Sequence, residues 1–525
     1  MSKSTKQSSQ KTHKLHLGRV IVFLLLLGGL GLGMVGANQR ISDSQASGNA
    51  EPWYGGYVDA TATPTYNFEE LETLPHNKNV VLSFIVADSE DPCTPTWGNA
   101  YNLSEAGTGL DLDRRVARLR QQDGTVAISF GGLLNDELAV VCEDEEALLN
   151  AYNSVIERYV VDTIDLDLEG TGLTDQAAGA RRARVLSKLQ AIKRSEGGSL
   201  AIWATVPVST DGLSEDGTNA VSTLLAGGVD LIGVNAMTMN FGDSRADGES
   251  MFEASRRALE STHRQLSILY EQADIELSPA TIWAKIGATP MLGQNDIRSE
   301  VFTFADAEKL NEFARENGIN RVSFWSANRD RPCGGNYVDL STVSDSCSGV
   351  EVDAGEFGRV LSEGFDASLS ASAGVVTERD EDFAARDLTD DPASSPYQIW
   401  SADGAYLQGT KVVWHRNVYE AKWWTQGDLP DDPVLQTWQT PWQLIGPVLP
   451  GETPIELPSL PAGTYPDWEG AKVYQAGARV LFDAAPYQAK WWTQGDSPAA
   501  ASSNADASPW APLSQAEIEE ILAER

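Results

Sequence analysis

Cysteine, histidine and basic residues are scarce in this chain of 525 residues. It has 4 cysteines and 5 histidines, and no two cysteines have the spacing of a Cys-x-x-Cys pair, so a zinc site is not expected. We therefore expect no metal and no other cofactor. The 39 basic residues stand against 75 acidic ones, and the net charge is -36 at pH 7. Such a surface repels phosphate backbones, which argues against nucleic acid as a partner.

The N-terminus has the features of a targeting segment. Several basic residues precede an uncharged, mostly apolar run from Val20 to Ala37, and small residues at its end offer a cleavage site. The run is also near the lower limit for spanning a bilayer. We expect residues 1–38 to be a signal peptide or a membrane anchor. The protein is then secreted or held at the extracellular surface.

The four cysteines fit an exported protein, because disulfide bonds persist in oxidising compartments. Cys93 with Cys142, and Cys333 with Cys347, are candidate disulfides. Four cysteines allow three pairings, and the sequence alone does not choose among them.

Residues 51–366 alternate short, β-rich apolar runs with amphipathic stretches, and helices are expected at 112–122 and 145–159. Strands separated by helices imply a parallel sheet with crossovers. About 315 residues of this α/β pattern fit a (β/α)8 TIM barrel, while a doubly wound open sheet stays an alternative on pattern alone. The strands are expected at 80–86, 126–130, 163–169, 200–206, 231–239, 282–288 and 322–326.

The last quarter of the chain is a tandem repeat rich in tryptophan. The run Tyr-x-Ala-Lys-Trp-Trp-Thr-Gln-Gly-Asp begins at Tyr419 and again at Tyr487, and the two copies align without a gap. Each copy has about 50 residues, too few for much of a core. We expect two small all-β modules added for avidity. The expected order is an acidic Ser/Ala linker at 367–394, a first module at 395–446, a Pro-rich linker at 447–462 and a second module at 463–515.

One predicted strand carries four acidic residues, Asp162, Asp165, Asp167 and Glu169. Side chains alternate along a strand, so the last three share one face and the apolar residues between them share the other. In a barrel these acids line the interior, with Glu169 nearest the C-terminal mouth where barrel active sites form. Stacked carboxylates resist simultaneous ionisation, so the pKa of the outermost acid should rise. A protonated carboxyl group near neutral pH is what a glycosidic leaving group requires.

Here the chain resembles glycoside hydrolase family 18, whose signature Asp-x-x-Asp-x-Asp-x-Glu is matched in full. The run Ser129-Phe-Gly-Gly132 is similar to the second family motif, Ser-x-Gly-Gly. The resemblance covers roughly residues 53–360, and runs such as 285–291 and 325–330 are most similar to a bacterial and archaeal chitinase branch. It implies that Ser129 belongs to the substrate site and that Trp325 forms the floor of the cleavage subsite.

The resemblance also implies a substrate-assisted, retaining mechanism. Glu169 would protonate the glycosidic oxygen, and the N-acetyl carbonyl of the substrate would be the nucleophile. Asp167 would orient the acetamido N–H, Asp165 would hold or share a proton with Asp167, and Asp162 would support the strand from its base.

One segment departs from the family pattern. Many members carry Met-x-Tyr-Asp on the sixth strand, and the matching run here is Met237-Thr-Met239-Asn240. Met239 offers no useful hydrogen bond to the acetamido oxygen, and Asn240 lacks the charge of a carboxylate. We still place Met237, Met239 and Asn240 in the substrate site. Phe241, Asn235 and Asn328 are alternatives for shaping that wall.

The repeats resemble family 5/12 carbohydrate-binding modules. Adjacent tryptophans on a strand point to opposite faces, so one of each pair is expected in the core and the other exposed for stacking on sugars. The expected sugar-binding residues are Tyr419, Trp423, Trp424, Tyr487, Trp491 and Trp492.

The leading interpretation is a monomeric chitinase that acts on chitin or N-acetylglucosamine oligosaccharides. An endo-β-N-acetylglucosaminidase acting on glycans is a second interpretation, since it shares the fold and motif. A non-catalytic chitin-binding surface protein is a third.

Overall fold

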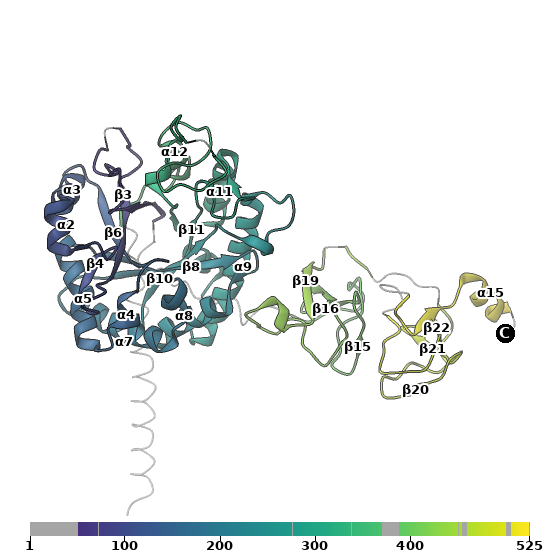
Figure 1. Cartoon of the computed structure of the whole chain (residues 1–525). Coiled ribbons are helices and arrows are strands. Elements are labelled where there is room, and N and C mark those ends of the chain that lie inside the picture. The colour runs from purple at the N-terminus through teal and green to yellow at the C-terminus, as the bar shows by residue number, and fades with distance from the viewer. Residues whose placement is uncertain are drawn as a thin grey trace, which may run out of the picture.

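The computed structural model describes residues 51–71, 73–275, 277–337, 339–369, 388–449, 451–453, 459–499 and 506–523. Within them, a large α/β body is followed by two small β modules (Figure 1). The expected targeting segment and most of the linker at 367–394 lie outside the described residues. In the described ranges, no helix has the length and apolar character needed to cross a bilayer.

The α/β body is a closed barrel with eight strand positions, as the sequence pattern predicts. The first position is split, because β1 (Trp53–Tyr54) pairs with the last strand of the barrel and β2 (Gly56–Asp59) pairs with β3. All neighbouring barrel strands are parallel, and the ring closes in the order β1/β2, β3, β6, β7, β8, β10, β11, β14. The remaining barrel strands are β3 (Asn79–Ala87), β6 (Thr125–Gly131), β7 (Thr163–Asp167), β8 (Ala201–Ser209), β10 (Leu231–Met237), β11 (Ile286–Thr289) and β14 (Arg321–Val322).

Helices surround the barrel, and apolar side chains fill two cores. The larger core lies between strands and helices, and a smaller one inside the barrel includes Trp53, Tyr57 and Trp203. Caps fix the helix starts; the Asp144 side chain, for example, accepts from the backbone N–H groups of Glu146 and Ala147. The helices are α2 (Leu103–Gly109), α3 (Leu112–Arg120), α4 (Leu138–Val141), α5 (Glu145–Tyr159), α6 (Gly170–Thr174), α7 (Gln176–Ser195), α8 (Glu215–Ala226), α9 (Met251–Gln272), α10 (Pro279–Ala284), α11 (Phe304–Asn317) and α12 (Glu356–Leu361). Short strands decorate the loops: β4 (Pro95–Trp97), β5 (Tyr101–Asn102), β9 (Gly212–Leu213), β12 (Gly293–Gln294) and β13 (Val301–Phe302).

Several strand limits differ from the sequence prediction. The predicted strand at 282–288 begins inside helix α10, because Ser278 caps that helix and Pro279 occupies its first turn. Strand β7 ends at Asp167, two residues before Glu169. Strand β14 covers only Arg321–Val322, so Trp325 lies beyond it.

The two C-terminal modules have the same strand pairing, so the sequence repeat is a structural repeat. In the first, β15 (Ala405–Tyr406) pairs with β18 (Thr425–Gln426), and β17 (Asn417–Ala421) lies between β16 (Lys411–Trp414) and β19 (Trp442–Pro447). The second module has the corresponding strands β20 (Val473–Tyr474), β21 (Arg479–Phe482), β22 (Ala485–Ala489), β23 (Thr493–Gln494) and β24 (Trp510–Pro512), followed by α15 (Gln515–Ala523).

Both candidate disulfides are present. Cys93 is bonded to Cys142, and Cys333 is bonded to Cys347. The first ties the segment between β3 and β4 to the end of α4, and the second closes a loop that follows β14. The expectation of disulfide bonds is confirmed.

Candidate active site

Strand β7 places its acidic and apolar side chains on opposite faces. Ile164, Leu166 and Leu168 are fully buried in the core between strands and helices. Asp165 and Asp167 are also buried, and they point to the barrel interior, where Asp165 meets side chains of four other strands. The alternation expected from the sequence therefore holds through the end of β7.

The Asp165 carboxyl group has four hydrogen-bonding partners. The hydroxyl groups of Ser129 and Thr205 donate to it at 2.7 and 2.6 Å, and the Tyr57 hydroxyl donates at 2.9 Å. The Arg321 guanidinium donates to Oδ1 of this carboxyl group at 2.5 Å, and both side chains are essentially without solvent contact. Burial lowers the pKa of Arg321, but Tyr57 and Asp165 outweigh it and leave that pKa raised. The Asp165–Arg321 ion pair thus anchors the base of the site.

Asp167 is in a different electrostatic position. Its Oδ1 atom is buried and has no hydrogen-bond partner among the described residues. Burial raises the pKa of Asp167 well above its usual range, and the charges of Glu169 and Asp165 raise it further, against a smaller opposing effect of Arg321. In the ladder formed by Asp165, Asp167 and Glu169, the surroundings of Asp167 therefore favour its protonated form, and its Oδ1 atom has hydrogen-bonding capacity to offer a ligand.

Glu169 lies directly after β7, at the start of the short helix α6. Its side chain is only partly exposed, and burial raises the pKa of its carboxyl group, as does the negative charge of Asp296. Gly170 follows with a φ of 48°, a conformation that favours glycine and turns the chain away from the strand. The geometry gives Glu169 the raised pKa that a general acid requires.

Asp296 was not identified from the sequence, and Asn240 positions it. The Asn240 side-chain amide donates to Asp296 Oδ2 at 2.7 Å, and the backbone N–H of Asp296 donates to Asn240 Oδ1 at 3.0 Å. The carboxylate absent from position 240 is thus supplied from the segment between β12 and β13. No spacing signal in the sequence links two residues 56 positions apart.

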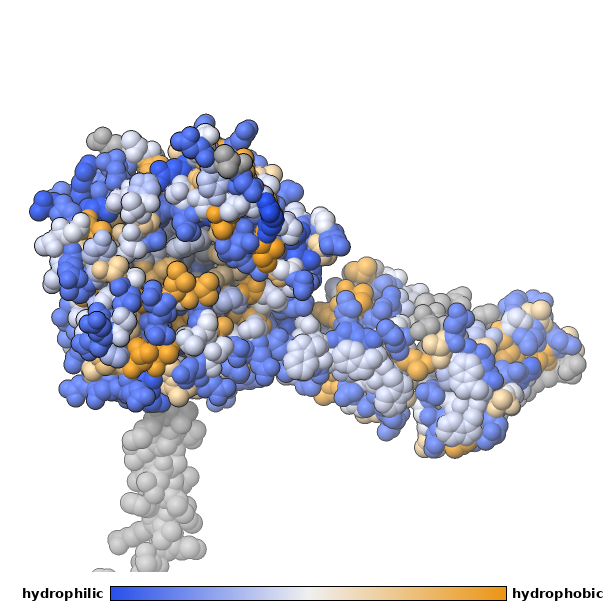
Figure 2. All heavy atoms as spheres, viewed as in Figure 1, coloured by the Kyte–Doolittle hydropathy of each residue, from blue (hydrophilic) through white to orange (hydrophobic). Residues whose placement is uncertain are grey.

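These groups open into a cleft of about 510 Å³ at the C-terminal ends of the barrel strands. Figure 2 shows a hollow on the viewed face of the barrel with hydrophobic side chains beside it, while the rest of that face is mostly hydrophilic. The lining includes Asp59, Phe84, Leu133, Leu134, Asp167, Glu169, Met237, Met239, Asn240, Asp296 and Trp325. Of the site residues expected from the sequence, Asp162, Asp165 and Ser129 are not part of this lining. Asp162 precedes the first residue of β7, at the end of the strand away from the cleft. Ser129 donates a hydrogen bond to Asp165 and does not face the cleft itself.

Two aromatic rings form one wall of the cleft. Trp325 stacks on Phe84 with ring centroids 5.5 Å apart and an interplanar angle of 21°. Both rings also contact Tyr57, which donates to Asp165. A flat apolar surface therefore lies beside the acidic ladder, and the family resemblance had indicated only Trp325 as part of it.

The Ser-x-Gly-Gly run packs directly against the ladder. Gly131 has a φ of 104°, and a Cβ atom there would lie 2.2 Å from the backbone oxygen of Asp167. The next residue, Gly132, donates its backbone N–H to the same oxygen at 2.9 Å. A side chain at position 131 would push β6 away from β7, so glycine is required for this close approach.

The modules differ from the sequence expectation in their aromatic residues. Both tryptophans of each pair are exposed, at 45% and 54% for Trp423 and Trp424 and at 46% and 56% for Trp491 and Trp492. They lie in the short segments that join β17 to β18 and β22 to β23, where the alternation of a strand does not apply. Tyr419 and Tyr487 are buried in the module cores, so their expected place on the binding surface is wrong.

The chain is similar to two curated chitinases, although no family model matches it. It is 34% identical over 292 residues to the probable bifunctional chitinase/lysozyme of Escherichia coli strain K12, covering 54% of this chain and 31% of that protein. It is 34% identical over 288 residues to Endochitinase 11 of Metarhizium anisopliae, covering 53% of this chain and 52% of that protein. The chain thus spans about half the length, or less, of these relatives.

Among solved structures, chitinase domains are similar to the barrel. The catalytic domain of the hyperthermophilic chitinase from Pyrococcus furiosus is 26% identical, with a TM-score of 0.51, and the match covers 62% of this chain and all of that chain. A catalytic-site mutant of active domain 2 from the same organism, complexed with chito-oligosaccharides, matches with a TM-score of 0.52. Fold and similarity together support a glycoside hydrolase domain. More particularly, they support the resemblance of the barrel to the catalytic domain of a family 18 chitinase.

Proposed function

We propose that the chain is a chitinase that hydrolyses β-1,4-linked N-acetylglucosamine polymers by substrate-assisted, retaining catalysis. The observation that carries this proposal is the buried ladder on β7, in which Asp165 is neutralised by Arg321 while the pKa values of Asp167 and Glu169 are raised. The names of both curated relatives and the oligosaccharide complex of the Pyrococcus furiosus domain support the same substrate class.

In the first step, Glu169 transfers its proton to the glycosidic oxygen as the bond from that oxygen to the anomeric carbon breaks. The carbonyl oxygen of the substrate acetamide forms the new bond to the anomeric carbon and gives an oxazolinium ion. The unpartnered Oδ1 atom of Asp167 accepts the acetamide N–H, which orients the nucleophile and stabilises its positive charge. Its proton resides on the other carboxyl oxygen.

In the second step, water attacks the anomeric carbon as the bond from that carbon to the acetamide oxygen breaks, and Glu169 takes the proton that water releases. Two displacements at one carbon retain the anomeric configuration. The Asp165–Arg321 ion pair lies at the base of the ladder, below Asp167. The stacked rings of Trp325 and Phe84 offer a flat surface to the apolar face of a sugar.

The two modules extend this function to insoluble chitin. Their exposed tryptophan pairs suit the flat faces of β-linked sugars, and four such rings on two modules provide avidity. The segment at 1–38 directs the chain out of the cytoplasm. Outside the cell the disulfides are stable, and the polymer is found there.

Hydrolysis of colloidal chitin by the wild type and by Glu169→Gln tests the proposal. The glutamine variant cannot donate the proton, so its turnover should fall by about 10²- to 10⁴-fold while oligosaccharide binding persists. Equal turnover by the two proteins, or none by the wild type, would contradict the proposal. Release of glycans from a glycoprotein without action on chitin would favour an endo-β-N-acetylglucosaminidase.

A further inference from the structure

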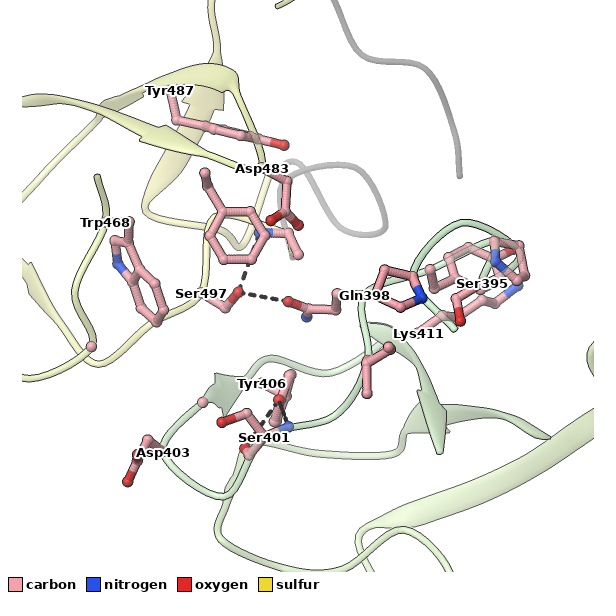
Figure 3. A pocket seen from close by; sticks show the side chains of 18 residues that line it. Ser395, Gln398, Ser401, Asp403, Tyr406, Lys411, Trp468, Asp483, Tyr487 and Ser497 are labelled. Atoms are coloured by element: carbon pink, nitrogen blue, oxygen red, sulfur yellow. Dashed lines mark hydrogen bonds between the residues drawn. The ribbon is translucent and has the colours of Figure 1, made fainter. Parts of the chain in front are cut away.

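A second cavity lies between the two modules and is built from both of them. It has a volume of about 650 Å³, within the range of ligand pockets. Figure 3 shows the side chains that converge on it, with Gln398, Ser401 and Tyr406 from the first module facing Trp468, Asp483 and Tyr487 from the second. None of the exposed tryptophans at 423, 424, 491 and 492 lines it.

Hydrogen bonds between the modules hold the walls of this cavity in place. The backbone N–H of Ala405 donates to the Gly495 oxygen at 3.2 Å, and the backbone N–H of Ser497 donates to the Ala405 oxygen at 3.1 Å. The Ser497 hydroxyl also donates to Gln398 Oε1 at 3.2 Å (Figure 3). The cavity is therefore part of a paired surface between two modules.

The lining combines aromatic faces with a small number of polar groups. Tyr397, Trp468 and Phe482 supply ring surface, and Gln398 Nε2 is a buried amide group without a partner among the described residues. The charged side chains are two carboxylates and one ammonium group, Asp403, Asp483 and Lys411. This composition disfavours an anion and suits a neutral ligand with a flat apolar face and hydrogen-bond acceptors.

The two copies of the repeat differ at the positions that open this cavity. In the first module, the Trp414 indole donates to Asp431 at 2.7 Å, and His415 stacks on Trp414 and pairs with the same carboxylate. The matching residues of the second module are Phe482, Asp483 and Ala499, and all three line the cavity. The first copy closes this patch with its own side chains, whereas the second copy leaves it open toward its neighbour.

We propose that this intermodular cleft is a further carbohydrate site, which binds a short stretch of a neutral N-acetylated β-1,4-linked sugar chain. The Nε2 group of Gln398 donates to an acetamide or hydroxyl oxygen, and the aromatic walls contact the sugar faces. The proposal rests on the proposed function for its substrate class. It adds a site that is separate from both the barrel cleft and the exposed tryptophans.

The test is isothermal titration of chitotetraose into the full chain. The chain carries Glu169→Gln to prevent hydrolysis and Ala in place of the four exposed tryptophans at 423, 424, 491 and 492. Two binding sites are expected, one in the barrel and one between the modules. Gln398→Ala should weaken only the second site, by about fivefold, since one hydrogen bond contributes about 1 kcal/mol. Gln443→Ala, at an exposed position of the same module, should change neither site.

Gln398→Trp fills the cleft and should remove the second site altogether. Near-ultraviolet circular dichroism shows whether that variant is folded. If it is not folded, the Gln398→Ala result alone tests the second site. A single barrel site, or a second site indifferent to Gln398, would overturn the inference and leave the chitinase proposal standing. Equal binding of cellotetraose would overturn the N-acetyl preference. Loss of both barrel binding and wild-type turnover would contradict the proposed function, whatever the cleft binds.

Discussion

Asp165, Asp167 and Glu169 share one strand and its end, yet their surroundings give them different roles. Asp165 is matched by the buried cation Arg321 and three hydroxyl groups. Within the part of the chain that the structure describes, one buried oxygen of Asp167 has no hydrogen-bond partner, and Glu169 faces the cleft beside Asp296. In the proposed mechanism the first carboxylate is structural, the next orients substrate and the last supplies a proton.

Asp296→Asn tests how the pKa of Glu169 is set. The charge of Asp296 raises that pKa, so removing it should lower the pKa and deprotonate the general acid at a lower pH. The alkaline limb of the kcat/KM profile should therefore move toward lower pH, while the acidic limb stays in place. Asp243→Asn, at an exposed position nearby, is the control and should leave the profile unchanged. An unmoved alkaline limb in Asp296→Asn would refute the role of Asp296.

Arg321→Met tests the buried ion pair. It leaves the Asp165 carboxylate buried without its cation, which should lower the free energy of unfolding by about 3–5 kcal/mol. Urea denaturation followed by fluorescence measures this loss. Adding Asp165→Asn should recover part of it, because the buried charge is gone. If the double variant is as unstable as the sum of the two single variants, the charge interaction is not the cause.

At the scale of elements, the sequence predicted most of what depends on local pattern. Alternation along 163–169 identified the acidic ladder, and the apolar run at 126–130 identified the strand that lies beside it in the structure. Arg321, Asp296 and Phe84 were beyond such reasoning, because each joins the site from a distant strand or loop. The tryptophan pairs were misjudged because a bend follows β17 and β22, and strand alternation ends there.

The bends after β17 and β22 give a prediction for the modules. Trp423→Ala with Trp424→Ala should weaken binding to insoluble chitin about tenfold or more, because stacking of the two rings on sugar faces contributes about 1 kcal/mol for each ring. The stability of the module should not change, because both rings are exposed. Trp442→Ala should instead destabilise the first module by about 3–5 kcal/mol, because that ring fills its core. Sedimentation with chitin and thermal unfolding measure the two effects. Normal chitin binding by the double variant would remove these rings from the binding surface.

At the scale of the whole molecule, the first module is joined to the barrel. Arg264 of α9 donates to the backbone oxygens of Val434 and Leu435, and Gln436 donates to the Leu213 oxygen at 3.2 Å. The Leu435 side chain packs against the barrel core. The module is thus attached to the side of the catalytic domain by a specific contact.

Leu435→Asp should break this contact, because it places a charge against an apolar surface. The radius of gyration measured by small-angle X-ray scattering should rise, while turnover of soluble chito-oligosaccharides should stay within about twofold because the substitution lies outside the cleft lining. An unchanged radius of gyration would show that the contact does not hold the module.

The anomeric form of the first product tests the central claim most directly. Proton NMR spectra of chitotetraose, recorded in the first minutes of hydrolysis, distinguish the β-anomer from the α-anomer before mutarotation mixes them. Transfer through the substrate's own acetamide predicts the β-anomer first, and no turnover when that acetamide is replaced by a free amine. Initial release of the α-anomer, or equal turnover of the deacetylated oligomer, would contradict the account.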